Sequence, residues 1–588
     1  MRTKGKRACV FLLALVSAVF MIVTACATGP ARARAGVYQA DIVVIGAGGA
    51  GMAAALMAHE AGASVVVLEQ LPFAGGNTLL AIGGFSAYGT RYQEQGTDSV
   101  ELMMLDVMQI GQNDEALVRV MSEKSGSAAD WISDLGADLT SVVRAAGAST
   151  ARLHRPSDGS AIGTSVAMAL NNAVGAAGIP VMLNTRGDRI LVDTNGVITG
   201  VVASREGREI TITTSAVVIA TGSFGANLEM VYQHNPQLRG FGASLHPGSL
   251  GGGLTMAEAI GAEIFDLNFM STGPTTDPAT GMLITMGART EGAILINRQG
   301  YRFVNETAPG MLVSLAIVDQ TGGLPFLVFD DHVRQTLAVI ESYITAGFVV
   351  EAASIRELAQ AIGVDPAVME ETIRRYNAFV DAGVDADFAR AEPTMVRVDG
   401  PRFYAFATAP GIIGNTGGIR INASSEVLRA NGTVIPGLFA AGEVTGGVQG
   451  RVQSGFSLAK IFSFGRLAGE KAAVFVRNNA GFTPCTIPDQ RPVFDARPQV
   501  RGSFTNGVFY GAAGSFGGPL NVRVTVTGGN IVSIDILSHH DTPGFFDAAR
   551  DIVTTSIIRY QNIGGADTVT GASVSRMAIM AAVMDAMN

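Results

Sequence analysis

The chain has 588 residues, of which 48% are hydrophobic and 15% charged, and its formal net charge is −9. This length predicts roughly two to four domains of about 100–200 residues each. The negative charge, with no basic stripe, argues against nucleic acid as a partner. The only cysteines are Cys9, Cys26 and Cys485, so we expect neither a disulfide framework nor a cysteine-based metal site.

Residues 1–25 have the pattern of a secretory signal. Four basic residues within the first seven positions precede an uncharged apolar run over 9–23, and small residues then lead to Cys26. This exit resembles a bacterial lipobox, which implies cleavage before Cys26 and lipid on its thiol. The alternative is an uncleaved anchor helix, although the apolar run is shorter than the ~20 residues of a membrane span. We expect an exported membrane lipoprotein that faces the periplasm or the cell exterior, with residues 26–38 as a tether.

Residues 41–69 predict a βαβ unit that binds a dinucleotide. Two apolar runs, 41–45 and 64–68, have the composition of buried parallel strands, and a glycine-rich turn and an alanine-rich helix lie between them. The turn fits G-x-G-x-x-G. Gly46 permits the tight turn, Gly48 lets the backbone approach a pyrophosphate, and Gly51 allows close packing of the helix on the strand. Glu69 ends the second strand, where a carboxylate accepts hydrogen bonds from ribose hydroxyls.

Further segments follow in chain order. We expect helices over about 100–145, short strands over about 180–220, a mixture over about 250–400, and a short strand at 436–441. A helix over about 455–475 precedes a linker at 477–494. Alternating apolar residues on both sides of a glycine turn at 527–530 predict a hairpin near the C-terminus.

Three more glycine segments, at 75–78, 220–224 and 438–443, follow predicted strands. With these segments, residues from about 41 to 471 resemble the flavoproteins of the fumarate reductase and succinate dehydrogenase superfamily. The resemblance implies non-covalent FAD in a Rossmann-type α/β domain over 39–246 and 405–476, interrupted by an α+β capping domain over 247–404. The implied cofactor-binding residues are Gly46, Gly48, Gly49, Gly51, Glu69, Gly76, Asn77, Thr78, Thr221, Gly222, Gly442 and Glu443.

Residues 300–306 resemble the G-x-R-F-x-N-E segment of this superfamily. The resemblance implies that Arg302 donates the proton while FAD donates hydride to a carbon–carbon double bond. Since guanidinium groups normally act only as donors, Arg302 would need a relay that reprotonates it. Arg289 matches the relay arginine of the fumarate reductases, and Met286 stands where their relay glutamate would be.

The predicted substrate pocket departs from the fumarate reductases. Thr272 lies in the region of their first histidine, and Asn415 stands in place of the second. Gln453 lies near the expected anchoring arginine, with Arg451 two residues away. A dicarboxylate requires paired charged anchors, so fumarate is an unexpected substrate, and the contacts of urocanate reductases are not evident either. A monocarboxylic or neutral conjugated compound fits better.

The last segment, 495–588, resembles a small α+β FMN-binding domain. Residues 567–573 match its D-x-x-[S/T]-G-A-[S/T] motif through Asp567, Thr570 and Ser573. The resemblance implies that a flavin transferase attaches FMN to Ser573 through a phosphoester. His539 and His540 have no partner at metal spacing, and we predict no metal site.

The whole pattern predicts an exported reductase. Electrons from a membrane donor would enter at FMN, pass to FAD and reduce an α,β-unsaturated small molecule. One alternative is a steroid-type dehydrogenase that runs this chemistry in reverse, because Tyr404 lies near where such enzymes keep a tyrosine; Tyr404 is therefore a fifth predicted substrate-binding residue. The other alternative is a lipoprotein that only relays electrons.

Overall fold

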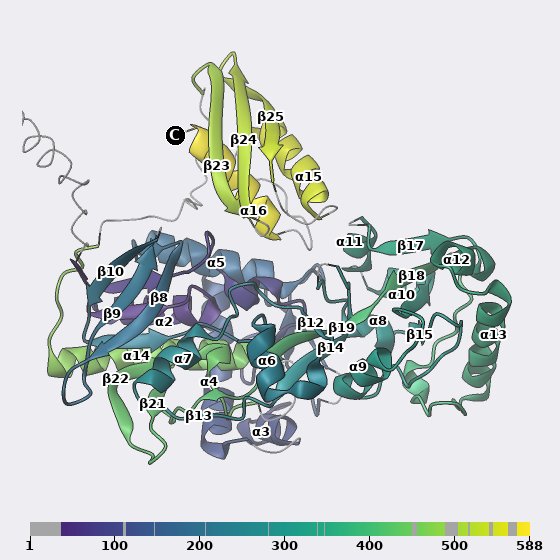
Figure 1. The fold of residues 1–588 in the computed structure, drawn as a ribbon, viewed down its shortest axis with the longest axis horizontal. Helices are drawn as coiled ribbons and strands as arrows, with labels where there is room; N and C mark the ends of the chain where they lie inside the picture. The colour runs from purple at the N-terminus through teal and green to yellow at the C-terminus, as the bar shows by residue number, and fades with distance from the viewer. Residues whose placement is uncertain are drawn as a thin grey trace, which may run out of the picture.

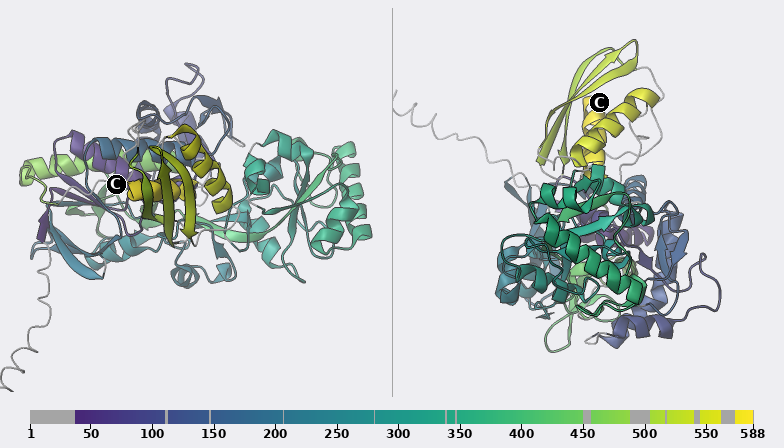
Figure 2. Two further views of the ribbon diagram at one scale, coloured as in Figure 1. Left: turned by 90° about the horizontal axis from the view of Figure 1, so that it is seen from above. Right: turned by 90° about the vertical axis from the view of Figure 1, so that its right-hand side faces the viewer.

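The structure is a computed structural model. It describes residues 37–587 except 110–112, 146–147, 206, 280, 338, 346, 450–455, 488–503, 516–517, 540–544 and 562–572. The fold is mixed α/β, with a Rossmann-type domain, an inserted α+β capping domain and a small C-terminal α+β domain, which agrees with the prediction. In Figures 1 and 2 the first two lie end to end, and the C-terminal domain stands to one side of them.

The Rossmann-type domain is built on a six-stranded sheet in the order β21-β22-β11-β2-β3-β7. The strands are β2 (Ile42–Ile45), β3 (Val65–Leu68), β7 (Val181–Met182), β11 (Ala216–Ile219), β21 (Glu426–Leu428) and β22 (Val434–Ala440). All pairings are parallel except that of β21 with β22. β2, β3 and β11 are buried along their whole length, which explains their continuous apolar runs.

The helices α2 (Gly49–Glu60) and α14 (Ser457–Asn479) pack against this sheet and against each other, and α5 (Ile162–Ala176) packs on α2. α14 is 397 residues beyond the end of α2 in sequence, yet the two helices are in close contact. Short side chains on α2, such as Ala53, Ala54 and Ala58, are fully buried and permit this approach. The C-terminal half of the domain is thereby joined to its N-terminal half.

Smaller sheets surround the domain. One sheet consists of β1 (Val37–Gln39), β10 (Arg208–Thr213), β9 (Ile198–Arg205) and β8 (Thr185–Val192); another of β4 (Phe85–Ser86), β6 (Leu153–Arg155) and β5 (Ser141–Val143). The Rossmann-type domain also contains four further helices, α3 (Val100–Met108), α4 (Glu115–Asp134), α6 (Leu228–His234) and α7 (Gly252–Ala259). At the junction with the capping domain lie β12 (Gly242–Ala243), β19 (Ala409–Asn415), β14 (Met270–Thr276), β13 (Ile264–Phe265) and β20 (Gly418–Ile419).

The capping domain has its own antiparallel sheet in the order β15-β16-β18-β17. The strands are β15 (Ile294–Ile296), β16 (Phe326–Asp330), β18 (Phe403–Ala407) and β17 (Val349–Ala352). The helices are α8 (Met286–Thr290), α9 (Gly310–Val318), α10 (Asp331–Thr336), α11 (Val339–Thr345), α12 (Ile355–Ile362) and α13 (Pro366–Ala382). Separate apolar clusters cover the two faces of this sheet.

The C-terminal domain contains the predicted hairpin. β23 (Gly507–Ser515), β24 (Gly518–Thr527) and β25 (Asn530–Ser538) form a sheet that packs on α15 (Phe545–Tyr560) and α16 (Ser573–Met587). Its apolar core is separate from that of the Rossmann-type domain, and Met282 and Phe348 of the capping domain pack against it. Within the described residues, no helix combines the length and apolarity that crossing a membrane requires. The predicted signal and residues 26–36 of the predicted tether lie outside those residues, whereas residues 37 and 38 of the tether belong to strand β1 and pair with β10.

Candidate active site and flavin cavity

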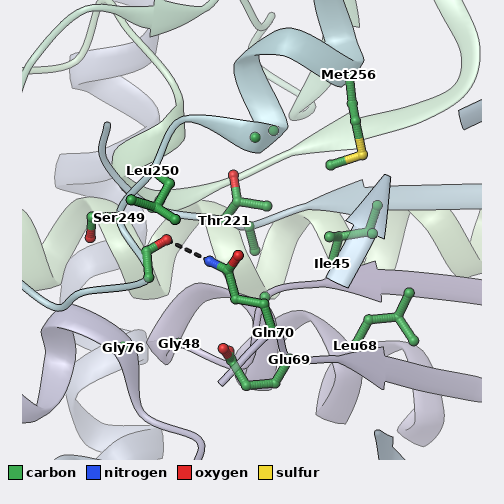
Figure 3. A pocket seen from close by; sticks show the side chains of 18 of the residues that line it. Ile45, Gly48, Leu68, Glu69, Gln70, Gly76, Thr221, Ser249, Leu250 and Met256 are labelled. Atoms are coloured by element: carbon green, nitrogen blue, oxygen red, sulfur yellow. Dashed lines mark hydrogen bonds between the residues drawn. The ribbon is translucent and has the colours of Figure 1, made fainter. Parts of the chain in front are cut away.

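A cavity of about 570 Å³ opens at the carboxyl ends of β2, β3 and β11. In parallel α/β sheets this is the edge where ligands bind. Chain segments that are far apart in sequence, from Ile45 to Ile461, contribute to its walls (Figure 3). The side chain of Gln70 crosses part of the cavity and donates a hydrogen bond to the Gly248 carbonyl at 2.6 Å.

The glycine turn has two physical roles in one short segment. Gly51 faces the strand, because a Cβ on it would lie 1.9 Å from the carbonyl oxygen of Gly46. Gly48 faces the cavity, and a Cβ there would meet no protein atom closer than 3.9 Å. α2 begins at Gly49 with no side-chain cap from Gly48, so unbonded N–H groups of its first turn remain available for a phosphate.

Glu69 lines the cavity and braces the glycine turn. Its carboxylate accepts hydrogen bonds from the backbone N–H of Ala47 at 3.0 Å and of Leu71 at 2.9 Å. Burial raises the pKa of Glu69 to about 6, although these hydrogen bonds act in the opposite direction. The carboxylate is therefore mostly ionised at neutral pH and keeps lone pairs for ribose hydroxyls.

Asn77 links two separate walls. Its Nδ2 donates to Oε2 of Glu443 at 2.7 Å, and its Oδ1 accepts from the backbone N–H of His246 at 2.8 Å. Burial raises the pKa of Glu443, and the hydrogen bond from Asn77 together with the charge of Lys460 partly offsets that effect.

Three polar atoms in the cavity wall are buried and have no partner in the protein: Thr221 Oγ1, His246 Nε2 and Glu443 Oε1. Burial lowers the pKa of His246 to about 4, so its ring is neutral near pH 7. Its Nδ1 faces the N–H of Gly248 at 3.4 Å, which places the ring proton on Nε2. A ligand must therefore accept one hydrogen bond and donate another, and the hydroxyls and carbonyls of FAD provide both.

The predicted cofactor residues come together at this cavity. Those that line it are Gly46, Gly48, Gly49, Glu69, Gly76, Asn77, Thr78, Thr221, Gly222, Gly442 and Glu443. Gly51 does not line it and instead holds α2 against β2. His246 was visible in the sequence but was not included in the predicted site, because a lone histidine is more often structural.

Arg302 lies away from the cavity, inside the capping domain. Its Nε and Nη2 donate to the two carboxylate oxygens of Glu306 at 2.9 and 2.8 Å, and Nη2 also pairs with Asp385 at 3.0 Å. The guanidinium carbon lies 4.6 Å from the ring centre of Tyr376. Burial alone would lower the pKa of Arg302, but the two carboxylates outweigh burial and raise it. These partners hold the Arg302 guanidinium in a buried ion-pair cluster and oppose the loss of its proton, and its role as the proton donor stays a prediction.

Arg289, the predicted relay residue, lies in the same cluster with fewer partners. Its Nη1 donates to the Glu306 carbonyl at 2.7 Å, and its buried Nε has no partner. Burial lowers the pKa of Arg289 to about 10, and the charge of Arg390 adds to that effect. Met286 on the same helix is 60% exposed, so it supplies no relay group.

Arg390 and Asp385 complete this cluster, and both were missed from the sequence. The guanidinium of Arg390 pairs with Glu306 at 3.2 Å and donates to the Ala293 carbonyl. Both residues come from the loop after α13, about 80 residues beyond the residues that they contact. No local pattern identifies such partners.

The predicted substrate residues that the structure describes, Thr272, Asn415 and Tyr404, do not line the flavin cavity. Asn415 is buried, accepts from Ser223 at 2.5 Å and donates to the Gly417 carbonyl at 2.6 Å. Tyr404 is buried in the capping core, where its hydroxyl pairs with Asp331 and Arg334. Both side chains thus have hydrogen-bond partners within the protein, and their substrate-binding role stays a prediction.

The other positions are only partly described. Thr272 Oγ1 accepts from Ser314 at 3.2 Å in the junction between β14 and α9. Arg451, Gln453, Asp567, Thr570 and Cys26 lie outside the described residues, as does the side chain of Ser573, the first residue of α16. His539 stacks on Phe546 at 3.6 Å between ring centres. In the described part of the chain, no three His, Cys, Asp or Glu side chains are arranged to hold a metal.

This fold and its cavity define an FAD-dependent oxidoreductase of the Rossmann type. The profile described as "FAD binding domain" matches residues 41–456, and the profile described as "FMN-binding domain" matches residues 515–588. The chain therefore belongs to the FAD-binding family of fumarate reductase-like flavoproteins and carries a C-terminal FMN-binding domain. Its cofactors are FAD and FMN, and it is an oxidoreductase of the type that acts on CH–CH groups.

The chain is 41% identical over 445 residues to fumarate reductase (cytochrome) of Shewanella frigidimarina, which covers 75% of this chain and 78% of the relative. It is 34% identical over 454 residues to urocanate reductase of Eggerthella lenta, with 74% of each chain covered. Among solved structures, the open conformation of a flavocytochrome c3 fumarate reductase matches with a TM-score of 0.69 and 33% identity, covering 77% of this chain and 80% of that one.

Proposed function

We propose that the protein reduces the carbon–carbon double bond of an α,β-unsaturated small molecule other than fumarate. The observation that carries the proposal is the presence of an FAD cavity and an FMN-binding domain in one reductase-like chain. When bound, FAD supplies hydride transfer and FMN supplies electrons. The protein positions the nucleotide through its glycine turn and through Glu69, Asn77 and Glu443.

The exclusion of fumarate rests on charge. A dicarboxylate requires cationic or paired hydrogen-bond anchors, yet at two of the predicted anchor positions stand Thr272 and Asn415, which are neutral and already bonded within the protein. A substrate with one carboxylate or none requires fewer such anchors. We therefore propose a monocarboxylic or neutral enoate or enone.

We also propose that the proton reaches the substrate through Arg289 and that Arg302 only positions Arg289. Arg302 holds the carboxylate of Glu306, and Glu306 in turn accepts from Arg289 through its carbonyl. A guanidinium with a lowered pKa and an unpartnered Nε is a better proton donor than one held by two carboxylates. Arg289→Gln should lower kcat at least tenfold with an unchanged melting temperature; an Arg289→Gln enzyme with the parental kcat would contradict this role.

Turnover tests the function directly. The holoprotein is reduced anaerobically with a viologen and offered acrylate-like, cinnamate-like, urocanate and steroid substrates, with fumarate as the comparison. We expect at least one monocarboxylic or neutral compound to be consumed faster than fumarate. If fumarate is the fastest substrate, the proposed substrate class is wrong. If no alkene is consumed while external acceptors are reduced, the electron-relay alternative is correct.

Attachment of lipid to Cys26 and of FMN to Ser573 also belongs to the proposal. The basic start, the apolar run and the small-residue exit support an exported, lipid-anchored protein with a membrane electron donor. A Cys26→Ala variant should leave the membrane fraction, and the mature parent should carry a lipid mass on its first residue. A parent protein that stays in the cytoplasmic fraction would contradict this localisation.

A further inference from the structure

Lys460 is a fully buried lysine directly behind the wall of the flavin cavity. Its side chain is 1% exposed on α14, one residue before Ile461, which lines the cavity. Its Nζ donates to the Thr445 carbonyl at 2.6 Å. Thr445 caps the short helix η4 (Gly442–Val444), whose first two residues also line the cavity.

In the described part of the chain, Lys460 has a backbone carbonyl and no carboxylate as its contact partner. Among the residues that the structure describes, no carboxylate forms a salt bridge with Lys460; the carboxylate that interacts with it electrostatically is Glu443. Burial lowers the pKa of Lys460 to about 8, and the charge of Glu443 partly opposes that effect. Burial thus disfavours the charged ammonium and the charge of Glu443 favours it, so a titratable cation lies in a poorly solvated site directly behind the cavity wall.

Glu443 is the cavity-lining residue whose charge interacts with that of Lys460. One carboxylate oxygen is held by Asn77, and the other, Oε1, is buried without a partner in the cavity wall. Glu69 follows β3 and Glu443 follows β22, so the two carboxylates reach the cavity from different strands, and we infer that Glu443 faces the flavin half of FAD. A cation behind a carboxylate that contacts the flavin acts on the flavin electrostatically across a poorly solvated region.

We propose that Lys460 is a positioning residue that raises the reduction potential of the bound FAD. Its positive charge offsets the negative charge of the Glu443 carboxylate, which by itself would lower that potential. Reduction places negative charge on the flavin, and a nearby buried cation favours that state while a nearby carboxylate disfavours it. This inference concerns the cofactor alone and does not depend on which alkene the protein reduces.

The test is the FAD midpoint potential of Lys460→Met holoprotein, measured by spectroelectrochemistry. Methionine keeps the length and burial of the side chain but removes the charge. At a fixed solution potential we expect the ratio of oxidised to reduced FAD to rise about tenfold, which corresponds to about 30 mV for a two-electron couple. Lys471→Met is the matched control, because Lys471 is exposed on the same helix, and its potential should equal that of the parent.

Glu443→Gln should shift the potential in the opposite direction, and the double variant should lie between the two single variants. A Lys460→Met protein with the same potential as Lys471→Met would overturn the proposal. If Lys460→Met does not retain FAD, Lys460→Gln takes its place, since glutamine can still donate to the Thr445 carbonyl. If neither binds FAD, a Glu443→Gln potential equal to that of the parent would also overturn it. A loss of melting temperature without a shift in potential would mean that Lys460 is only structural.

Discussion

The two buried arginines of the capping domain, Arg302 and Arg289, differ in their contact partners. Arg302 has two carboxylates and an aromatic face, whereas Arg289 has a carbonyl and a free nitrogen. Both are arginines in the same cluster, and burial acts on both. The carboxylate partners raise the pKa of Arg302, whereas burial lowers the pKa of Arg289, and the proposal that Arg289 donates the proton rests on this difference.

Replacement of Arg302 should destabilise the capping domain. In Arg302→Leu, the carboxylates of Glu306 and Asp385 stay buried without their cation, which costs about 3–5 kcal/mol. Arg397→Leu is the control, because Arg397 also pairs with two carboxylates, Asp381 and Asp399, but is 41% exposed; its loss should stay below about 1 kcal/mol. Denaturant unfolding measures both. Equal losses of unfolding free energy in the two variants would show that the buried ion pairs of Arg302 do not stabilise the domain.

His246 should make the FAD-depleted protein sensitive to acid. Burial lowers its pKa to about 4 in the folded chain, against about 6.5 for a free histidine side chain. Because the folded pKa is lowered, the unfolded chain binds the proton more tightly. The stability contributed by the neutral ring is complete above pH 6.5 and is lost as the pH falls toward 4. Between pH 7 and pH 5 this loss is about 2 kcal/mol.

The His246→Gln variant should therefore lose about 2 kcal/mol less than the parent over the same interval, as read from denaturant unfolding at pH 7 and pH 5. His59→Gln, an exposed position on α2, should behave like the parent. If the unfolding free energies of the parent and of His246→Gln depend on pH in the same way, burial does not lower the pKa of His246.

At the scale of the element, two glycines at the start of α2 have different roles: Gly48 faces the cofactor cavity, and Gly51 packs against the preceding turn. Gly48→Ala should leave folding unchanged and weaken FAD binding at least tenfold, since its Cβ meets only cavity space. Gly51→Ala should destabilise the protein by about 3 kcal/mol or more, because its Cβ would overlap the Gly46 carbonyl. Thermal unfolding and FAD titration of both variants distinguish the roles. Weakened FAD binding without loss of stability in Gly51→Ala would contradict the assignment.

The same scale explains which elements were predictable. β2, β3 and the hairpin of β24 and β25 follow from apolar runs and turn glycines that lie next to one another in sequence. The contact of α14 with α2, and the capping loop that supplies Asp385, depend on segments hundreds or tens of residues apart. The apolar periodicity of a short stretch of sequence does not indicate which distant segment that stretch will contact.

For the whole molecule, the separate core of the C-terminal domain implies that its flavin can be removed without disturbing the FAD cavity. Ser573→Ala, expressed with a flavin transferase, should lack the FMN-sized mass and keep one FAD per chain. Electron delivery from a membrane donor should fall at least tenfold. Parent protein expressed without the transferase is the control and should behave in the same way. Covalent FMN on the Ser573→Ala chain would place the attachment at another residue.

The amino-acid sequence by itself determined the dinucleotide turn, the set of glycine segments around FAD, the order of domains and the family. These features depend on backbone conformation and apolar period over short windows, where each residue constrains its neighbours. Only the tertiary structure decided which polar side chains are free. Arg302, Asn415 and Tyr404 have partners from distant segments, while His246 Nε2 and Glu443 Oε1 are left without a protein partner at the cavity. Burial and pairing are long-range properties, and they arise only when the chain is folded.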